Sequence, residues 1–134
     1  MVGGGQAGLV TGYYLRRCGE DVVILDAGIR IGDPWRHRWE SLRLFTLPRY
    51  ASLPGWRIPV TTFPTKDDMA DYLEQYAARF QLPVRSATRV TEVTRAGETF
   101  VVQMSFSEVG CTSARVAGRV CRQVLTLDVR SHLQ

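Results

Sequence analysis

Two segments of the chain carry apolar residues at helical spacing. In residues 6–17 the apolar positions include Leu9, Val10 and Tyr13, and Gly19 follows as a stop signal. The second segment begins after residues 65–68, Thr-Lys-Asp-Asp, which resemble a capping box with Asp in place of the more usual Glu. Its apolar stripe consists of Met69, Tyr72, Leu73, Tyr76 and Phe80. We predict two helices, and we expect this stripe to lie in the core.

Strand patterns stand on both sides of these helices. Residues 22–25 form a continuous apolar run, typical of a parallel strand buried on both faces, and Met1-Val2 supplies a very short strand before the first helix. Residues 84–95 predict one or two strands, residues 96–98 a turn, and residues 99–104 the return strand of a hairpin. The alternation predicts an α/β fold, with a parallel sheet, helices and a β-hairpin or meander.

A long segment without clear periodicity, residues 27–64, separates the second strand from the second helix. It contains all three tryptophans and five of the six prolines. Loops of this length are usually functional or disordered, and the aromatic content argues against disorder. We interpret it as an ordered loop whose aromatic side chains line a ligand. The alternative is that these side chains pack on the protein's own core, and both interpretations can hold in part.

Composition excludes several classes of protein. The chain has 134 residues, 45% of them hydrophobic and 22% charged, which suits one soluble domain. No apolar stretch is as long as a membrane span, and we find no secretory signal, so we expect a cytoplasmic protein without a membrane partner. The net charge of +4 comes from sixteen arginines and one lysine, without an aromatic–basic repeat, so we expect no nucleic-acid partner.

The cysteines indicate neither a disulfide framework nor a metal site. Cys18, Cys111 and Cys121 form no C-x-x-C pair and no ligand spacing with His37 or His132. We expect no bound metal, and we expect Cys18 to be a buried thiol near the end of the first helix. A sparse, odd number of cysteines suits a reducing compartment.

The glycines directly after Met1-Val2 form the motif with the clearest chemistry. Gly3, Gly5 and Gly8 give G-x-G-x-x-G between a strand and a helix, and Asp26 ends the next strand, eighteen residues after Gly8. In dinucleotide-binding units the first glycine permits the turn, the second admits the pyrophosphate and the third allows close packing of helix on strand. The acid accepts hydrogen bonds from a ribose. We therefore predict a dinucleotide site.

Taken together with the long loop, the chain resembles the N-terminal part of flavin-containing monooxygenase-like enzymes over residues 1–104. The motifs that carry the resemblance are Gly3–Gly8, residues 26–28 (Asp-Ala-Gly), residues 31–35 (Ile-Gly-Asp-Pro-Trp), residues 36–46 with Trp39-Glu40-Ser41-Leu42, and residues 63–66 (Phe-Pro-Thr-Lys). The resemblance implies FAD as the cofactor and an incomplete Rossmann-type FAD-binding domain. It places the cofactor-binding residues at Gly3, Gly5, Gln6, Ala7, Gly8, Asp26, Gly32, Trp35 and Val90.

In complete members of this family NAD(P)H reduces the flavin, which then reacts with oxygen and a small-molecule substrate. The present chain has no second G-x-G-x-x-G and no Ala-Thr-Gly strand end after the hairpin. We therefore expect the NAD(P)H site to be absent here and this truncated chain to be inactive. Where relatives commonly have Gly-Gly before the tryptophan, this chain has Gly32-Asp33. No residue has a partner suited to acid, base or nucleophilic catalysis, so no catalytic residue is assigned.

We divide the chain into an N-terminal part of an FAD-binding domain, residues 1–105, and an atypical tail, residues 106–134, either frame-shifted or disordered. Residues 124–127 could form a short strand in that tail. Two alternatives remain: a non-catalytic nucleotide-binding module and a non-functional truncated gene product. A simple NAD-dependent dehydrogenase is disfavoured by the aromatic loop after Asp26, and Arg30 is interpreted as a solvated loop charge rather than a contact to NADP. The sequence sets no oligomeric state.

Overall fold

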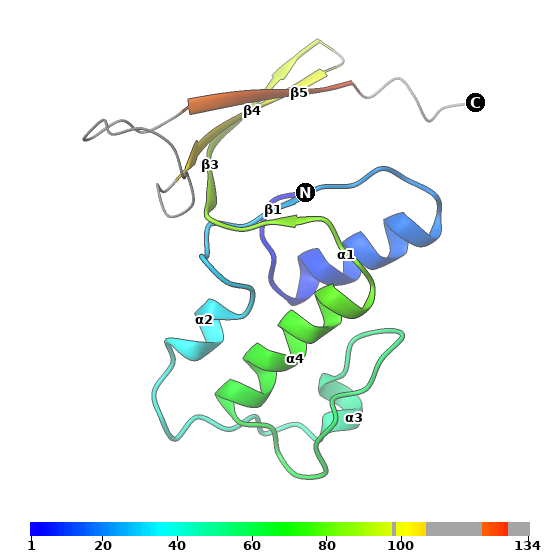
Figure 1. Ribbon diagram of the computed structural model, residues 1–134, viewed down its shortest axis with the longest axis vertical. Coiled ribbons are helices and arrows are strands. Elements are labelled where there is room, and N and C mark those ends of the chain that lie inside the picture. The colour runs from blue at the N-terminus through cyan, green and yellow to red at the C-terminus, as the bar shows by residue number, and fades with distance from the viewer. Residues whose placement is uncertain (98, 107–121, 129–134) are drawn as a thin grey trace.

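The computed structural model describes residues 1–97, 99–106 and 122–128, and side chains within 1–97 and 99–105. It is a mixed α/β structure with a small parallel sheet and a separate antiparallel sheet (Figure 1). Its elements are α1 (Gln6–Arg17), β1 (Ile24–Leu25), α2 (Asp33–Arg36), α3 (Pro48–Ala51), α4 (Lys66–Arg79), β2 (Val84–Arg85), β3 (Thr88–Ala96), β4 (Thr99–Phe106) and β5 (Arg122–Asp128).

The parallel sheet is built from very short segments. Strand β1 pairs with β2 in parallel, with Ile24 opposite Val84. On its other side, Val2 forms a parallel bridge to Leu25, and the amide of Gly3 donates to the Leu25 carbonyl at 2.8 Å. The chain thus passes from Val2 through α1 to an adjacent parallel strand, as a βαβ unit requires. Of the predicted strand over residues 22–25, only the last two residues belong to β1.

The antiparallel sheet has the strand order β3-β4-β5. The predicted hairpin is confirmed: β3 and β4 pair from Thr88 opposite Phe106 to Ala96 opposite Thr99, with a register shift between Val90 and Glu92. Strand β5 pairs with β4 and contains the short strand predicted at residues 124–127. The rest of the predicted tail, residues 107–121 and 129–134, lies outside the described residues, as do Cys111, Cys121 and His132. The boundary at residue 105 stays a prediction.

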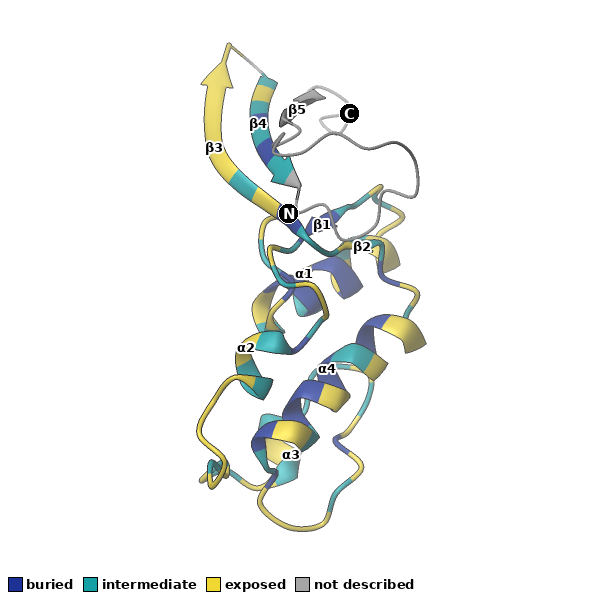
Figure 2. Ribbon diagram, turned by 60° about the vertical axis from the view of Figure 1, so that its left-hand side comes forward, coloured by how far each residue is buried: buried dark blue, intermediate teal, exposed yellow. Residues whose placement is uncertain are grey.

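The main core lies where α1, β1 and α4 meet. Leu9 of α1 and Ile24 of β1 are fully buried against the α4 stripe, whose predicted core position is confirmed. Figure 2 shows buried positions concentrated on α1, β1 and α4, whereas most of β3 is exposed. The buried members of the α4 stripe are Met69, Tyr72, Leu73 and Tyr76, and Phe80 packs partly buried at the helix end.

Helix α1 spans the predicted residues 6–17, and Gly19 follows it with a φ of +82°. A positive φ is the conformation that glycine adopts without a steric penalty, which explains the stop at this position. The prediction for Cys18 was wrong, because its thiol is exposed. Cys18 is the C-cap of α1, and the buried positions of the helix are Gly8, Leu9, Gly12 and Tyr13, which form a different face.

Helix α4 begins with the predicted capping box. The Thr65 hydroxyl accepts from the Asp68 amide at 3.1 Å, and the Asp68 carboxylate accepts from the Thr65 amide at 2.8 Å. Both bonds satisfy backbone donors that the first turn of a helix leaves without partners. Aspartate therefore performs here the role that glutamate has more often.

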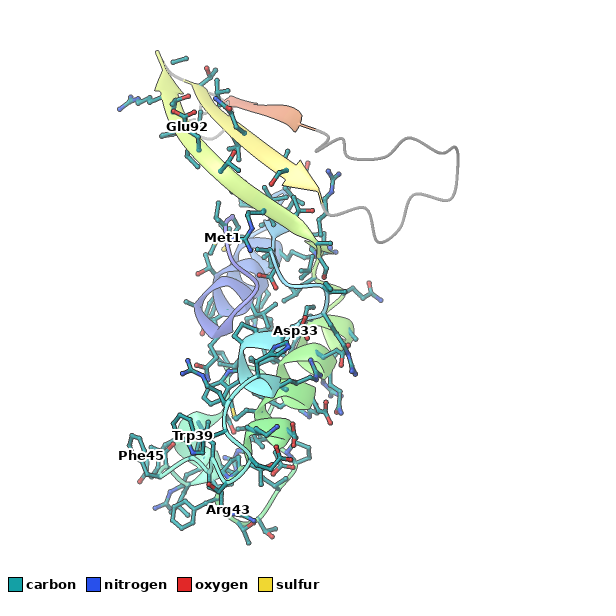
Figure 3. All side chains as sticks on the ribbon, turned by 90° about the vertical axis from the view of Figure 1, so that its left-hand side faces the viewer. Met1, Asp33, Trp39, Arg43, Phe45 and Glu92 are labelled. Carbon is teal, nitrogen blue, oxygen red and sulfur yellow. The ribbon has the colours of Figure 1, made fainter. Side chains whose placement is uncertain are left out.

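The long loop over residues 27–64 contains the short helices α2 and α3 and divides its aromatic side chains between two environments. Trp35 and Trp56 pack partly buried against the main core, as the core alternative predicts. Others remain exposed, and Figure 3 shows Trp39, Arg43 and Phe45 together at the end of the molecule remote from Glu92. The exposed aromatic residues of the loop are Trp39, Phe45, Tyr50 and Phe63.

We expect Thr65→Ala to lower the free energy of unfolding by about 1 kcal/mol, because the substitution removes the side-chain acceptor of the capping box. Urea denaturation followed by circular dichroism measures the change. Thr62→Ala is the matched control, since Thr62 is exposed and precedes the helix. Equal losses in the two variants would show that the capping box does not stabilise α4.

Candidate functional site

The glycine turn lies between Val2 and α1 and brings backbone close to backbone. Gly3 has a φ of +95°, and a Cβ at Gly8 would collide with the Gly3 carbonyl oxygen. A Cβ at Gly12 would lie 2.7 Å from Cδ1 of Ile24. These contacts press α1 directly onto the parallel strands, the packing role expected of the third glycine. Gly5 differs, because a Cβ there would have no atom within 4 Å.

Asp26 follows β1 and lies against the glycine turn. Its amide donates to the Arg85 carbonyl at 2.9 Å, and its carbonyl accepts from the Thr88 amide at 2.8 Å. These backbone bonds hold residue 26 between β2 and the start of β3. The carboxylate atom Oδ2 lies 3.0 Å from where a Cβ of Gly4 would stand. The structure thus brings Asp26 against the glycine turn, although Asp26 lies eighteen residues after Gly8 in the sequence.

The N-terminus of α1 is arranged differently from that of α4. Its N-cap is Gly5, no side chain caps the first turn, and no acidic residue lies in that turn. Helix α4 instead has its capping box and two first-turn aspartates. Uncapped amides and the helix dipole attract an anion, and an acid in the first turn would oppose it. The amide groups of Gln6, Ala7 and Gly8 at the start of α1 are therefore suited to a phosphate.

Gly32 and Trp35 belong to a second cluster, on α2 and α4. Gly32 is buried as the N-cap of α2 with a φ of +88°, and a Cβ there would lie 2.6 Å from the Ala70 carbonyl oxygen. Trp35 packs partly buried against the main core. Gly28 lies between this cluster and Asp26. A Cβ added at Gly28 would stand 3.4 Å from the Asp26 carboxylate and 3.6 Å from Cβ of Asp33.

The carboxylate of Asp33 is engaged within the protein. It accepts from the Arg30 amide at 2.9 Å and lies 3.6 Å from the Arg36 guanidinium. Arg36 also donates to the Ile31 carbonyl at 2.6 Å. The negative charge that replaces the second glycine of the related motif is therefore matched by a cation of the same short helix.

An ion-pair network that the sequence did not reveal joins α2 to α4. Arg30 donates to both oxygens of Glu74, at 2.7 and 2.6 Å, and Arg36 donates to Glu74 at 3.1 Å and to Asp71 at 3.0 Å. Hydrogen bonds from Arg30 lower the pKa of the Glu74 carboxyl, and Arg36 acts in the same direction. Arg30 is an exposed loop charge, as interpreted from the sequence, but it is also paired with Glu74. The only sequence signal was the Asp71 and Glu74 spacing on one helix face.

Lys66, the only lysine, is buried at 7% exposure at the start of α4. Its ammonium donates to the Arg36 carbonyl at 3.1 Å and lies 3.4 Å from Asp67 and 3.6 Å from Glu40. A buried ammonium is costly without such partners. Lys66 therefore adds a further connection between the end of α2 and α4.

Val90 lies in β3 and packs against a second, smaller core. Its neighbours there are Leu25 of β1 and the buried Val102 and Met104 of β4. Since Leu25 directly precedes Asp26, the Val90 segment stands beside the glycine turn. The structure therefore brings the predicted site residues to the carboxyl ends of the parallel strands, where α/β sheets bind ligands, and sets Gly32 and Trp35 on the adjoining α2.

The described residues contain no group of three or more His, Cys, Asp or Glu placed to hold a metal ion. Within the same part of the chain, no helix is both long and apolar enough to cross a membrane.

This geometry agrees with the relationship of the chain to known proteins. Residues 1–118 match the sequence model of the pyridine nucleotide-disulphide oxidoreductase family. The chain belongs to this family, and within it resembles the flavin-containing monooxygenases and CzcO-like oxidoreductases.

Three relatives illustrate the likeness. An uncharacterized CzcO-like oxidoreductase of Geobacillus kaustophilus is 43% identical over 76% of this chain and 30% of its own length. The flavin-containing monooxygenase of Stenotrophomonas maltophilia is 42% identical, with a TM-score of 0.73 over 77% of this chain and 32% of that one. OTEMO in complex with FAD and NADP is 25% identical, with a TM-score of 0.65 over 77% of this chain and 21% of that one. The chain thus spans about a third of the length of the first two.

We expect Gly8→Ala to destabilise the protein by about 1–3 kcal/mol, since its Cβ would push the Gly3 carbonyl away. This cost exceeds the gain in helix propensity of about 0.5–1 kcal/mol. Gly5→Ala is the control and should cost only about 0.5–1 kcal/mol, because its Cβ meets no atom and only the N-cap preference for glycine over alanine is lost. Urea denaturation tests both. A Gly8→Ala variant as stable as the parent would contradict the close packing.

The lowered pKa of Glu74 makes a pH-dependent contribution to stability. Its ion pairs act fully above the ordinary glutamate pKa, and their contribution is lost as pH falls through the lowered folded-state pKa. Glu74→Gln should therefore reduce stability at neutral pH and lose less of it on acidification than the parent. The measurement is urea unfolding at several pH values between 7 and about 3.

Glu92→Gln is the matched control for that experiment, because the exposed Glu92 is paired with the neutral amide of Gln103 at 2.8 Å. It should follow the pH profile of the parent. A Glu74→Gln profile that also follows the parent would show that the network with Arg30 contributes nothing.

Proposed function

We propose that this chain is the FAD-binding part of a flavin-dependent, monooxygenase-type oxidoreductase, with an incomplete Rossmann-type fold. One observation carries the proposal. The uncapped glycine turn Gly3–Gly8 and the carboxylate of Asp26 follow adjacent parallel strands and lie against each other, with Oδ2 of Asp26 3.0 Å from the Cβ position of Gly4. A pyrophosphate and a ribose are neighbours in FAD, so a site for both needs this proximity.

The residues present suit the cofactor. Gly5 leaves open the space beside the backbone, and the first turn of α1 offers amides without an acid or a cap. We propose that Gly3, Gly5, Gln6, Ala7 and Gly8 hold the pyrophosphate and that Asp26 accepts hydrogen bonds from the ribose.

The remaining assignments extend this site along the cofactor. We propose that the Val90 backbone lies near the adenine and that Gly32 and Trp35 approach the flavin. Because Asp33 is already engaged by Arg30 and Arg36, its carboxylate does not need to be neutralised by a ligand. The flavin itself would supply the electron transfer and oxygen chemistry, and this chain binds, orients and shields it.

The remaining parts of the reaction are proposed for the whole protein. We propose NAD(P)H as the reductant, oxygen as co-substrate and a small-molecule substrate. The support is that OTEMO is found in complex with FAD and NADP and that another similar structure is a flavin-containing monooxygenase, of which this chain spans about a third. We propose that the 134-residue chain by itself does not oxidise NADPH. The support is the absence of a second glycine turn from its sequence.

The test is retention of FAD by the 134-residue chain after gel filtration, followed by flavin absorbance and fluorescence titration. We expect binding by the parent and loss of it in Gly5→Ala, which keeps its fold while a methyl group occupies the phosphate approach. Asp26→Ala should weaken binding about tenfold or more, because it removes a charged hydrogen-bond acceptor.

Asp21→Ala is the matched control, since Asp21 is exposed and precedes the same strand. It should bind FAD as the parent does. If the folded parent retains no more FAD than Gly5→Ala, the proposed site is wrong. NADPH oxidation by the chain alone would contradict the proposed division of functions.

A further inference from the structure

Two adjoining hollows lie around α3, and both are lined by Arg49, Ser52 and Arg57. The first measures about 300 Å³ and has an apolar wall that includes Leu47, Ile58 and Val60. The second measures about 500 Å³ and includes Pro54 and Trp56. Both hollows are open to solvent, and volumes of this order are in the range of small organic ligands. In Figures 1 and 2, α4 lies between α1 and α3, so this region is separate from the glycine turn.

The loop that carries Arg57 is fixed by two tyrosines of α4. The Tyr72 hydroxyl accepts from the Leu53 amide and donates to the Trp56 carbonyl, both at 2.7 Å. The Tyr76 hydroxyl donates to the Pro54 carbonyl at 2.6 Å, and burial raises the pKa of Tyr76 to about 12, so this donor keeps its proton. The hollows therefore have walls that exist before any ligand arrives, which lowers the cost of binding.

Ser52 fixes the opposite side of the same loop. Its hydroxyl donates to the Pro48 carbonyl at 2.5 Å and accepts from the Ile58 amide at 3.0 Å. The end of α3, which carries Arg49, is thus tied to Ile58, the residue after Arg57. Since the Ser52 hydroxyl already makes both of these hydrogen bonds, we expect the guanidinium groups of Arg49 and Arg57 to contact a charged ligand.

These guanidinium groups are not neutralised by the surrounding protein. Among the described residues, neither Arg49 nor Arg57 lies within 4.0 Å of a carboxylate, and the described lining of the hollows contains no Asp or Glu. Arg49 instead rests over the Tyr50 ring at 4.7 Å. This contrasts with Arg30 and Arg36, which are paired with acids.

We propose that the region around α3 is a binding site for a small amphipathic carboxylate. Arg49 and Arg57 would contact the carboxylate, because a guanidinium matches its two oxygens. The apolar body would lie on Leu47, Ile58 and Val60, where burial of apolar surface adds affinity. Arg49 and Arg57 are exposed at the edge of the hollows. A purely ionic ligand would make no contact with the apolar wall, and a neutral apolar ligand would make no use of the two guanidinium groups. The proposal is independent of FAD binding.

The test uses the complete 134-residue chain and 4-phenylbutyrate as the probe. Calorimetric titration measures its affinity, and the arginine side-chain Nε–H signals in NMR locate it. We expect the signals of Arg49 and Arg57 to shift. Arg49→Gln and Arg57→Gln should each weaken binding about tenfold or more, as the loss of a charge-assisted hydrogen bond predicts.

Two further variants and two further ligands make the proposal falsifiable. Arg89→Gln makes the same charge change at an exposed position of β3 and should leave the affinity unchanged. The neutral analogue 4-phenylbutan-1-ol should bind about tenfold or more weakly than the acid, and inorganic phosphate should bind more weakly than phenylbutyrate. Arg49→Lys keeps the charge and should lose less affinity than Arg49→Gln.

Thermal unfolding of each variant confirms that it is folded. Phenylbutyrate that does not bind, or that shifts other arginine signals but not those of Arg49 and Arg57, would overturn the site. Equal binding of the acid and the alcohol would overturn the role of the arginines, and phosphate bound as tightly as phenylbutyrate would overturn the role of the apolar wall.

Discussion

The direct contact of α1 with the parallel strands is the constraint on which the rest of the structure depends. Gly8 stands against the Gly3 carbonyl and Gly12 against the Ile24 side chain, so at these two positions the helix has no side chain of its own between its backbone and the strands. Because the helix lies this close, the glycine turn that leads into it lies beside Asp26, and Leu9 and Tyr13 reach the α4 stripe. A larger spacing would separate the turn from the acid and also leave the core unfilled. The same glycines therefore serve both packing and the proposed cofactor site.

Local signals predicted the two long helices and the hairpin, but not the short helices α2 and α3. Helix α1 spans the residues predicted from its apolar pattern and Gly19, and α4 begins at the capping box of Thr65 and Asp68. Such signals depend on neighbours in sequence, which the chain itself displays. The hairpin of β3 and β4 also follows from alternation and a turn. The proximity of Asp26 to the glycine turn was predictable because parallel strands place their carboxyl ends together.

Contacts between distant segments were not predictable in the same way. Arg30 and Glu74 are forty-four residues apart, and nothing local to either indicates the pair. Helix α3 and the hollows beside it depend on hydroxyl groups of Tyr72 and Tyr76, which in sequence look like ordinary core positions. Cys18 was misjudged because the position of the apolar face of α1, rather than the residue type, decides its exposure.

Helix α4 supports two regions with different chemistry. Glu74 and Asp71 hold the α2 segment through arginines, whereas Tyr72 and Tyr76 hold the loop after α3 through carbonyl and amide groups. The helix thus presents acids on one face, and on another face the apolar stripe, which includes both tyrosines and packs in the core with α1 and β1. The positions of the α2 segment and of the loop after α3 therefore both depend on the position of α4.

The burial of Lys66 has a consequence for the chemistry of the chain's amines. With sixteen arginines and a single lysine, the only side-chain amine is enclosed between Arg36, Glu40 and Asp67. Acylating reagents and enzymes that modify lysine need an accessible amine, so the folded protein offers Lys66 poorly and the unfolded chain offers it fully. The extent of modification at this one residue is therefore a direct chemical reporter of whether α4 is folded onto α2.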